Sequence, residues 1–153
     1  MAVTAKSRAR TALLAGTNLE PAEALEIVKS ATGQVKGGGM SLGTSGIVNV
    51  GAQVHIEREQ PDRLALSITS GKRVVELCTF SAVAELEGDW TALTVGGLET
   101  YKTSQSRLFG LIPMGPASIP GFSLYKRFLS EIQTQMQVAD PQASISIQDP
   151  ATG

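Results

Sequence analysis

The chain has 153 residues, a mass of 16.0 kDa and a formal net charge of −1, with 42% hydrophobic and 18% charged residues. This length predicts a single domain with a sizeable core, and the proportion of apolar residues excludes wholesale disorder. The nearly neutral charge also argues against a nucleic-acid partner, because phosphate binding normally requires a basic excess.

The N-terminal stretch, residues 1–16, combines basic residues with a short apolar run. Lys6, Arg8 and Arg10 precede the apolar sequence Ala-Leu-Leu-Ala-Gly, which resembles a signal peptide only in outline. The run falls short of the roughly 7 to 15 apolar residues of a signal peptide. We therefore expect a flexible basic arm or a short helix over residues 1–16, in a cytoplasmic protein. No run reaches the ~18 apolar residues of a membrane-spanning helix, so no membrane span is expected.

One N-terminal helix is predicted over residues 17–33. Thr17 or Asn18 serves as its N-cap, acidic residues follow in the first turn, and Gly33 ends it. The segment after it, residues 34–46, is rich in glycine and serine. It lacks the Gly-Lys-Ser/Thr sequence of a phosphate-binding loop, so we interpret it as a linker.

From Ile47 onward the hydrophobic period changes to two, which predicts antiparallel strands. Four runs separated by turn residues carry this pattern: 47–57, 64–69, 73–86 and 90–98, the last continuing to 103. The third run is too long to keep one face, so a bulge is expected near residues 78–81. Cys78, the only cysteine, lies in this run and is interpreted as a buried free thiol.

The clearest helical period covers residues 123–138, where apolar residues recur every fourth position. This pattern predicts an amphipathic helix with one face for burial. The expected fold class is therefore α+β: an antiparallel meander of about four or five strands, covered by this C-terminal helix, with one N-terminal helix. The single domain is expected to span residues 17–138. Residues 139–153 are predicted to be a loose tail or a short edge strand.

The segment that joins the strands to this helix, residues 108–122, is strongly apolar yet contains three prolines and three glycines. These prolines and glycines predict an irregular loop. An apolar surface loop covers the core, lines a pocket or contacts a partner, and the sequence leaves these three readings open.

Residues for catalysis or metal binding are sparse. His55 is the only histidine, which excludes a catalytic triad or a multi-histidine metal site as these are usually built. Lys126 and Arg127 are interpreted as a solvated helix face, although they are suited to an anionic head group. We therefore predict no catalytic residue, no metal site and no cofactor.

The succession of strands, Gly/Pro-rich loop and C-terminal amphipathic helix over residues 47–138 resembles the helix-grip domains of the START and polyketide-cyclase type. In that family a curved antiparallel sheet wraps a long last helix and encloses an apolar cavity. The resemblance is one of architecture, without motif residues. The chain departs from the family in its few strands and in lacking a clear first strand before the helices. A cystatin-like or other helix-on-sheet fold is the alternative.

The sequence therefore favours a small non-catalytic binding domain that accepts an apolar small molecule between the sheet and the C-terminal helix. The alternative is a structural or protein-interaction module that self-associates through the apolar segment 108–122, which leaves monomer and homodimer both open. The predicted ligand-contacting residues are Phe109, Ile112, Met114, Phe122, Tyr125, Phe128 and Met136.

Overall fold

The computed structural model describes residues 5–35, 52–70, 75–108 and 112–149, with the backbone alone for residues 5–6, 104–108 and 112–118. Three predicted features lie outside these ranges: the linker from residue 36 onward, the start of the first strand, and the turn between the second and third strands from residue 71 onward. The elements in chain order are α1 (Ala5–Arg8), β1 (Ala12–Thr17), α2 (Pro21–Gln34), β2 (Gln53–Gln60), β3 (Arg63–Ser70), β4 (Val75–Glu87), β5 (Trp90–Gly96), β6 (Thr100–Tyr101), β7 (Ser104–Leu108), β8 (Ile112–Ser118), α3 (Phe122–Ala139) and β9 (Ser144–Gln148).

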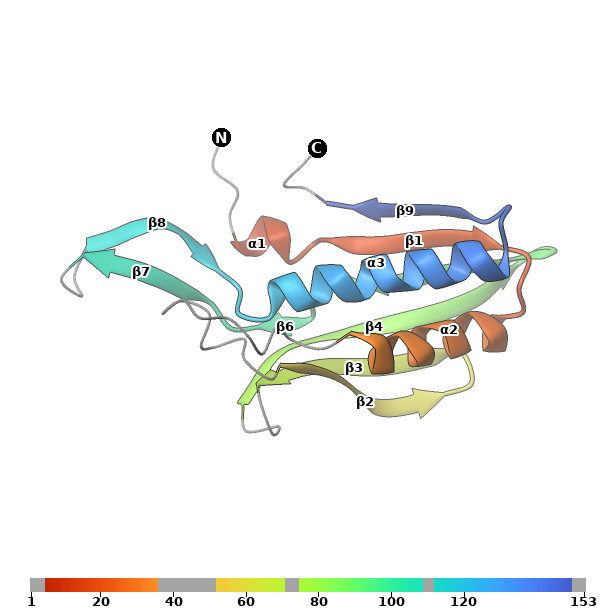
Figure 1. Cartoon of the computed structure of the whole chain (residues 1–153), viewed down its shortest axis with the longest axis horizontal. Helices are drawn as coiled ribbons and strands as arrows, with labels where there is room; N and C mark the ends of the chain where they lie inside the picture. The colour runs from red at the N-terminus through yellow and green to blue at the C-terminus, as the bar shows by residue number, and fades with distance from the viewer. Residues whose placement is uncertain (1–4, 36–51, 71–74, 109–111, 150–153) are drawn as a thin grey trace.

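The main sheet is antiparallel and has the strand order β2-β3-β4-β5-β1-β9, with β6 pairing on β4. Both α2 and α3 lie on the same face of this sheet (Figure 1). The opposite face of the sheet carries no helix among the described residues. The predicted α+β class, with an N-terminal and a C-terminal helix packing on an antiparallel sheet, is confirmed.

Strand β1 corrects the prediction of a flexible arm or a short helix over residues 1–16, in which the helix α1 covers only Ala5–Arg8. Residues 12–17 pair with β5 on one side and with β9 on the other, in the interior of the sheet. Leu13, Ala15 and Thr17 are buried toward the helices, whereas Leu14 faces away. An apolar run too short for a signal peptide has the length of a strand. The run lacked a visible partner in the sequence because β5 and β9 both follow it by more than 70 residues.

The meander β2–β5 matches the predicted strands, and it contains the predicted bulge in β4. Ile68 pairs with Cys78 while the next residue, Thr69, pairs with Glu76, so Leu77 is the extra residue. Leu77 and Cys78 are consequently both buried although they are adjacent. The bulge lies one position before the predicted range, and it allows the long apolar strand to change which residues face the core.

The apolar segment 108–122 is more regular than predicted. Its backbone forms β8, which pairs with β7 in a separate two-stranded sheet. This hairpin extends beyond the end of the main sheet, at the left of Figure 1. The irregular loop was thus the wrong prediction for residues 112–118. Prolines are compatible with such a ribbon because, among the described residues, each of its strands pairs on one edge only.

Helices α2 and α3 begin with different N-terminal caps. The N-cap of α2 is Glu20 rather than Thr17 or Asn18, and it forms a reciprocal capping box with Glu23, whose side chain accepts a 3.0 Å hydrogen bond from the Glu20 N–H. Helix α3 follows Gly121, which has a φ of 87°. A side chain at Gly121 would be strained in this conformation and would crowd Leu77, so glycine sets the turn into α3.

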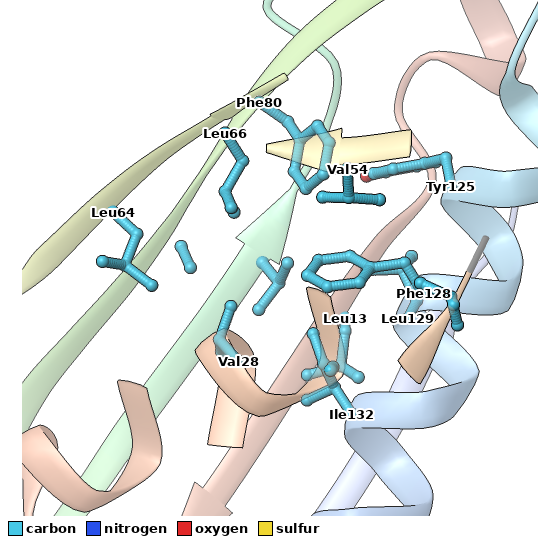
Figure 2. Close-up of a cluster of buried hydrophobic side chains, with 14 of the residues drawn as sticks. Leu13, Val28, Val54, Leu64, Leu66, Phe80, Tyr125, Phe128, Leu129 and Ile132 are labelled. Atoms are coloured by element: carbon cyan, nitrogen blue, oxygen red, sulfur yellow. The ribbon is translucent and has the colours of Figure 1, made fainter. Parts of the chain in front are cut away.

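The core lies between the helices and the sheet (Figure 2). Ala24 and Ala31 of α2 are fully buried, and their small side chains let that helix approach the sheet closely. The largest fully buried side chains come from four strands and both helices, so one continuous core connects them. They include Leu13, Val28, Leu64, Leu66, Phe80, Leu93, Tyr125, Phe128, Leu129 and Ile132.

Candidate functional site

The predicted contact residues of α3 form an aromatic cluster with the sheet. Phe80 of β4 makes edge-on contacts with Tyr125 and Phe128, with ring centroids 4.9 Å and 5.7 Å apart. Phe122 lies 6.0 Å from Tyr125 by the same measure. Tyr125, Phe128 and Met136 are fully buried and Phe122 is half-buried. Figure 2 shows Tyr125 and Phe128 pointing toward Phe80, which is the arrangement of a packed core.

Tyr125 also has a polar contact that ties α3 to the start of β1. Its hydroxyl donates a hydrogen bond to the backbone carbonyl of Thr11. Burial raises the pKa of Tyr125 above its usual range, so the phenol stays neutral and remains a donor. Thr11 is itself fully buried. The Tyr125 hydroxyl therefore satisfies a backbone carbonyl that water does not reach, so this hydrogen bond stabilises the fold.

The other predicted contact residues lie on or beside the hairpin. Ile112 and Met114 belong to β8, where they pair in register with Leu108 and Ser106. Phe109 lies outside the described residues. The structure thus brings four of the seven predicted residues together on α3, and it places the backbone of two others on a different sheet.

His55 occupies a cross-strand position of the sheet. Its Nε2 is 2.9 Å from the Thr69 hydroxyl, and the neighbouring Glu57 accepts a 2.6 Å hydrogen bond from Ser67. These contacts link β2 to β3 across the face without helices. The described residues contain no group of three or more His, Cys, Asp or Glu side chains placed to hold a metal ion.

The single thiol and the lysine of α3 are both accounted for by local structure. Cys78 is buried, and this burial raises the pKa of its thiol to about 12, so the nucleophilic thiolate is scarcely populated.

Lys126 forms a 2.7 Å ion pair with Asp149, whose side chain is only 7% exposed. This pair joins α3 to the residue that directly follows β9.

The open surface offers grooves that the sequence did not reveal. One of about 340 Å³ lies on the helix-free face of the sheet, where Leu14 and Trp90 are each 43% exposed. The Trp90 ring packs on Gly16, where an added Cβ would come within 3.0 Å of it. In the sequence, this groove could be anticipated only from the alternation of side chains along β1, which places Leu14 on the opposite face of the strand from Leu13 and Ala15. This groove is lined by Leu14, Ala15, Gly16, Trp90, Ala92, Leu93, Thr94, Ser144 and Ser146.

Two further grooves differ in chemistry. A groove of about 450 Å³ runs between α2 and α3 and includes Ile27 and Val138, the latter 80% exposed. A polar pocket of about 260 Å³ on the helix-free face contains Arg58, Arg63 and Glu99. Neither groove, nor the one beside Trp90, is lined by a predicted contact residue.

No described helix combines the length and the apolar character that a membrane crossing requires. Comparison of the whole chain with protein-family models, with curated proteins and with solved structures gives no match. The fold and the surface geometry are therefore the basis for any functional conclusion.

Proposed function

We propose that this protein is a non-catalytic interaction module that self-associates, with the apolar segment 108–122 as the contact. The observation that carries this proposal is the position of β7 and β8. They form a two-stranded sheet of their own, which extends beyond the main sheet (Figure 1).

An isolated two-stranded hairpin is marginally stable in water, and it needs further packing to persist. Strand β7 is mostly polar, but the sequence from Leu108 onward is rich in apolar residues, and apolar surface is removed from water when a partner covers it. The apolar residues of the segment are Leu108, Phe109, Leu111, Ile112, Met114, Ile119 and Phe122. Ile119 is buried within the chain and Phe122 is half-buried against its core, so the contact is assigned to the residues before them.

The test is the molar mass of the protein by light scattering over a range of concentrations. We expect an assembly larger than 16.0 kDa for the wild type, and a smaller one for the double variant Ile112→Ser/Met114→Ser. Leu86→Ser is the matched control, because Leu86 is an apolar side chain that is 62% exposed on another part of the surface. A wild type that stays monomeric, or a double variant with unchanged mass, would refute the proposal.

A second candidate is the binding of an apolar small molecule in the manner of helix-grip domains. Strand β1 favours it. It pairs with β5, the last long strand of the meander, and it is a first strand that the sequence pattern did not show. Against it stands the filled space around Phe80, Tyr125 and Phe128. A ligand would have to displace these rings, and half-buried Phe122 marks the most accessible end of the cluster.

Titration with a fluorescent fatty acid tests this second candidate. Saturable binding that weakens in Phe122→Ala, and persists in the Leu86→Ser control, would support it. The absence of saturable binding by the wild type would eliminate it.

A further inference from the structure

The two edges of the main sheet are built differently. Edge strand β2 carries Glu57, Arg58 and Glu59 in succession, and its pairing with β3 is interrupted by a bulge between Ile56 and Arg58. Charged side chains and bulges are the usual means by which proteins prevent an edge strand from pairing with another chain. The β2 edge is therefore protected against association.

Edge strand β9 has neither protection. Its sequence is Ser-Ile-Ser-Ile-Gln, without a charge or a proline, and its five residues pair with β1 without a register shift. Among the described residues no strand pairs with its other side, which forms the outer edge in Figure 1. Alternate backbone N–H and C=O groups of an edge strand point away from the sheet and are available to a further strand.

The sequence of β9 is complementary to itself when read antiparallel about Ser146. In that register Ser146 meets Ser146 of a second copy, and Ile145 meets Ile147. Both isoleucines are half-buried and pack against the core, so the apolar pairs lie on the helix side. Cross-strand pairs of β-branched residues stabilise a sheet. On the opposite face the matched residues are exposed and uncharged.

We propose that β9 pairs antiparallel with β9 of a second copy of this chain, about a two-fold axis at Ser146, so that the two main sheets become one. A two-fold axis is the commonest symmetry of soluble homo-oligomers. Charge does not oppose this pairing, because Asp149, which directly follows β9, is paired with Lys126 of its own chain.

The pairing also gives a role to the exposed apolar groove beside β9. Leu14 is opposite Ser146 in the β1–β9 register. The two-fold axis therefore aligns Leu14, Ser146, Ser146 of the second copy and Leu14 of the second copy in one row. The grooves beside Trp90 in the two copies become one trough across the helix-free face.

Ser146→Lys tests the pairing, since residue 146 is exposed and its replacement leaves the β1–β9 contact in place. The variant sets two ammonium groups against each other at the axis, and like charges directly opposite are destabilising. We expect association through β9 to weaken at least about ten-fold, and Ser146→Glu to do the same. An equimolar mixture of the two variants is expected to recover the assembly, because opposite charges then meet.

The matched control is Gln53→Lys, which adds the same charge to an exposed residue of the protected edge strand β2 and is expected to leave the mass unchanged. All variants are also made on the Ile112→Ser/Met114→Ser background, so that association through β9 is measured separately from association through segment 108–122. There the parent is expected to be a dimer, and addition of Ser146→Lys is expected to give a monomer of 16.0 kDa. If Ile112→Ser/Met114→Ser leaves the mass of the wild type unchanged, only the proposed function is refuted. If Ser146→Lys leaves the mass unchanged, only the β9 pairing is refuted.

A monomeric parent on that background, an unchanged mass on adding Ser146→Lys, or a mixture that stays monomeric would overturn the pairing. Circular dichroism and thermal unfolding of each variant show whether it is folded. Should Ser146→Lys fail to fold, Ser146→Cys replaces it. Two cysteines facing each other at the axis lie within disulfide range, so oxidation is expected to cross-link Ser146→Cys and not Gln53→Cys. The native Cys78 is buried and does not compete.

Discussion

The two faces of the main sheet differ in almost every physical respect. The face under α2 and α3 carries large apolar side chains that are fully buried, among them Phe80 and Leu93. The other face carries serines, threonines, charged residues and the exposed side chains of Leu14 and Trp90. The covered face accounts for the stability of the fold, whereas the open face and the strand edges beside it are available for contacts with other molecules.

The largest effect is expected from Phe128, which α3 inserts between the sheet and α2. Phe128→Ala removes a fully buried ring and leaves a cavity, so we expect the free energy of unfolding to fall by about 3–5 kcal/mol. Leu86→Ala on the exposed end of β4 is expected to change it by less than ~0.5 kcal/mol. Urea unfolding measures both. Equal effects would mean that the ring is not part of the core.

The contact of α3 with β5 is tested by Gly96. A Cβ at this position would clash with the Tyr125 hydroxyl oxygen, and the backbone there has a φ of 95°. We expect Gly96→Ala to destabilise the protein by roughly 1–3 kcal/mol, measured by thermal or urea unfolding.

Gly33 near the end of α2 is the matched control, because no atom lies within 4 Å of its added Cβ. There the same substitution is expected to stabilise the helix by roughly 0.5–1 kcal/mol, since alanine has the higher helix propensity. A Gly96→Ala protein as stable as the wild type would contradict the close approach of Tyr125.

Asp140 joins the C-terminal end of α3 to β1, and it predicts a pH dependence. Its Oδ2 accepts hydrogen bonds from the Thr17 hydroxyl at 2.7 Å and from the Asn18 N–H at 2.9 Å. These bonds, the Thr17 hydroxyl first, lower the pKa of Asp140. A carboxylate with a lowered pKa contributes stability above its unfolded pKa of about 3.9 and loses it as the pH falls through the folded value.

We therefore expect Asp140→Asn to lower stability near neutral pH and to reduce the loss of stability below pH ~4. The measurement is the urea midpoint from acidic to neutral pH. Thr17→Val is expected to act in the same direction, because it removes the main donor. An identical pH profile for wild type and Asp140→Asn would show that the carboxylate is not held by these bonds.

The smallest effect on stability is expected at Cys78, where the informative quantity is the rate of thiol modification. Because the thiol is buried and its pKa is raised to about 12, we expect negligible reaction with a thiol reagent at neutral pH in the native protein. Reaction is expected to become rapid in denaturant. Fast modification of the folded protein would mean that the covered face opens readily near the β4 bulge.

Local elements were largely predictable because each carries its own periodicity. The four-residue recurrence of α3 placed Leu124 and Ile132 in the core, and the alternation of β3 did the same for Leu64 and Leu66. The same pattern did not decide whether Tyr125 contacts a ligand or belongs to the core. A pattern shows that a side chain is buried, but it does not distinguish packing against Phe80 from packing against a ligand.

The sequence by itself determined that this chain is an α+β domain with an N-terminal helix and an amphipathic C-terminal helix, because helix and strand signals are local properties. The tertiary structure alone decided that β1 inserts between β5 and β9, that Tyr125 anchors α3 to Thr11, and that β9 becomes an unprotected edge. These outcomes depend on pairings between residues more than 70 positions apart, which no local period encodes.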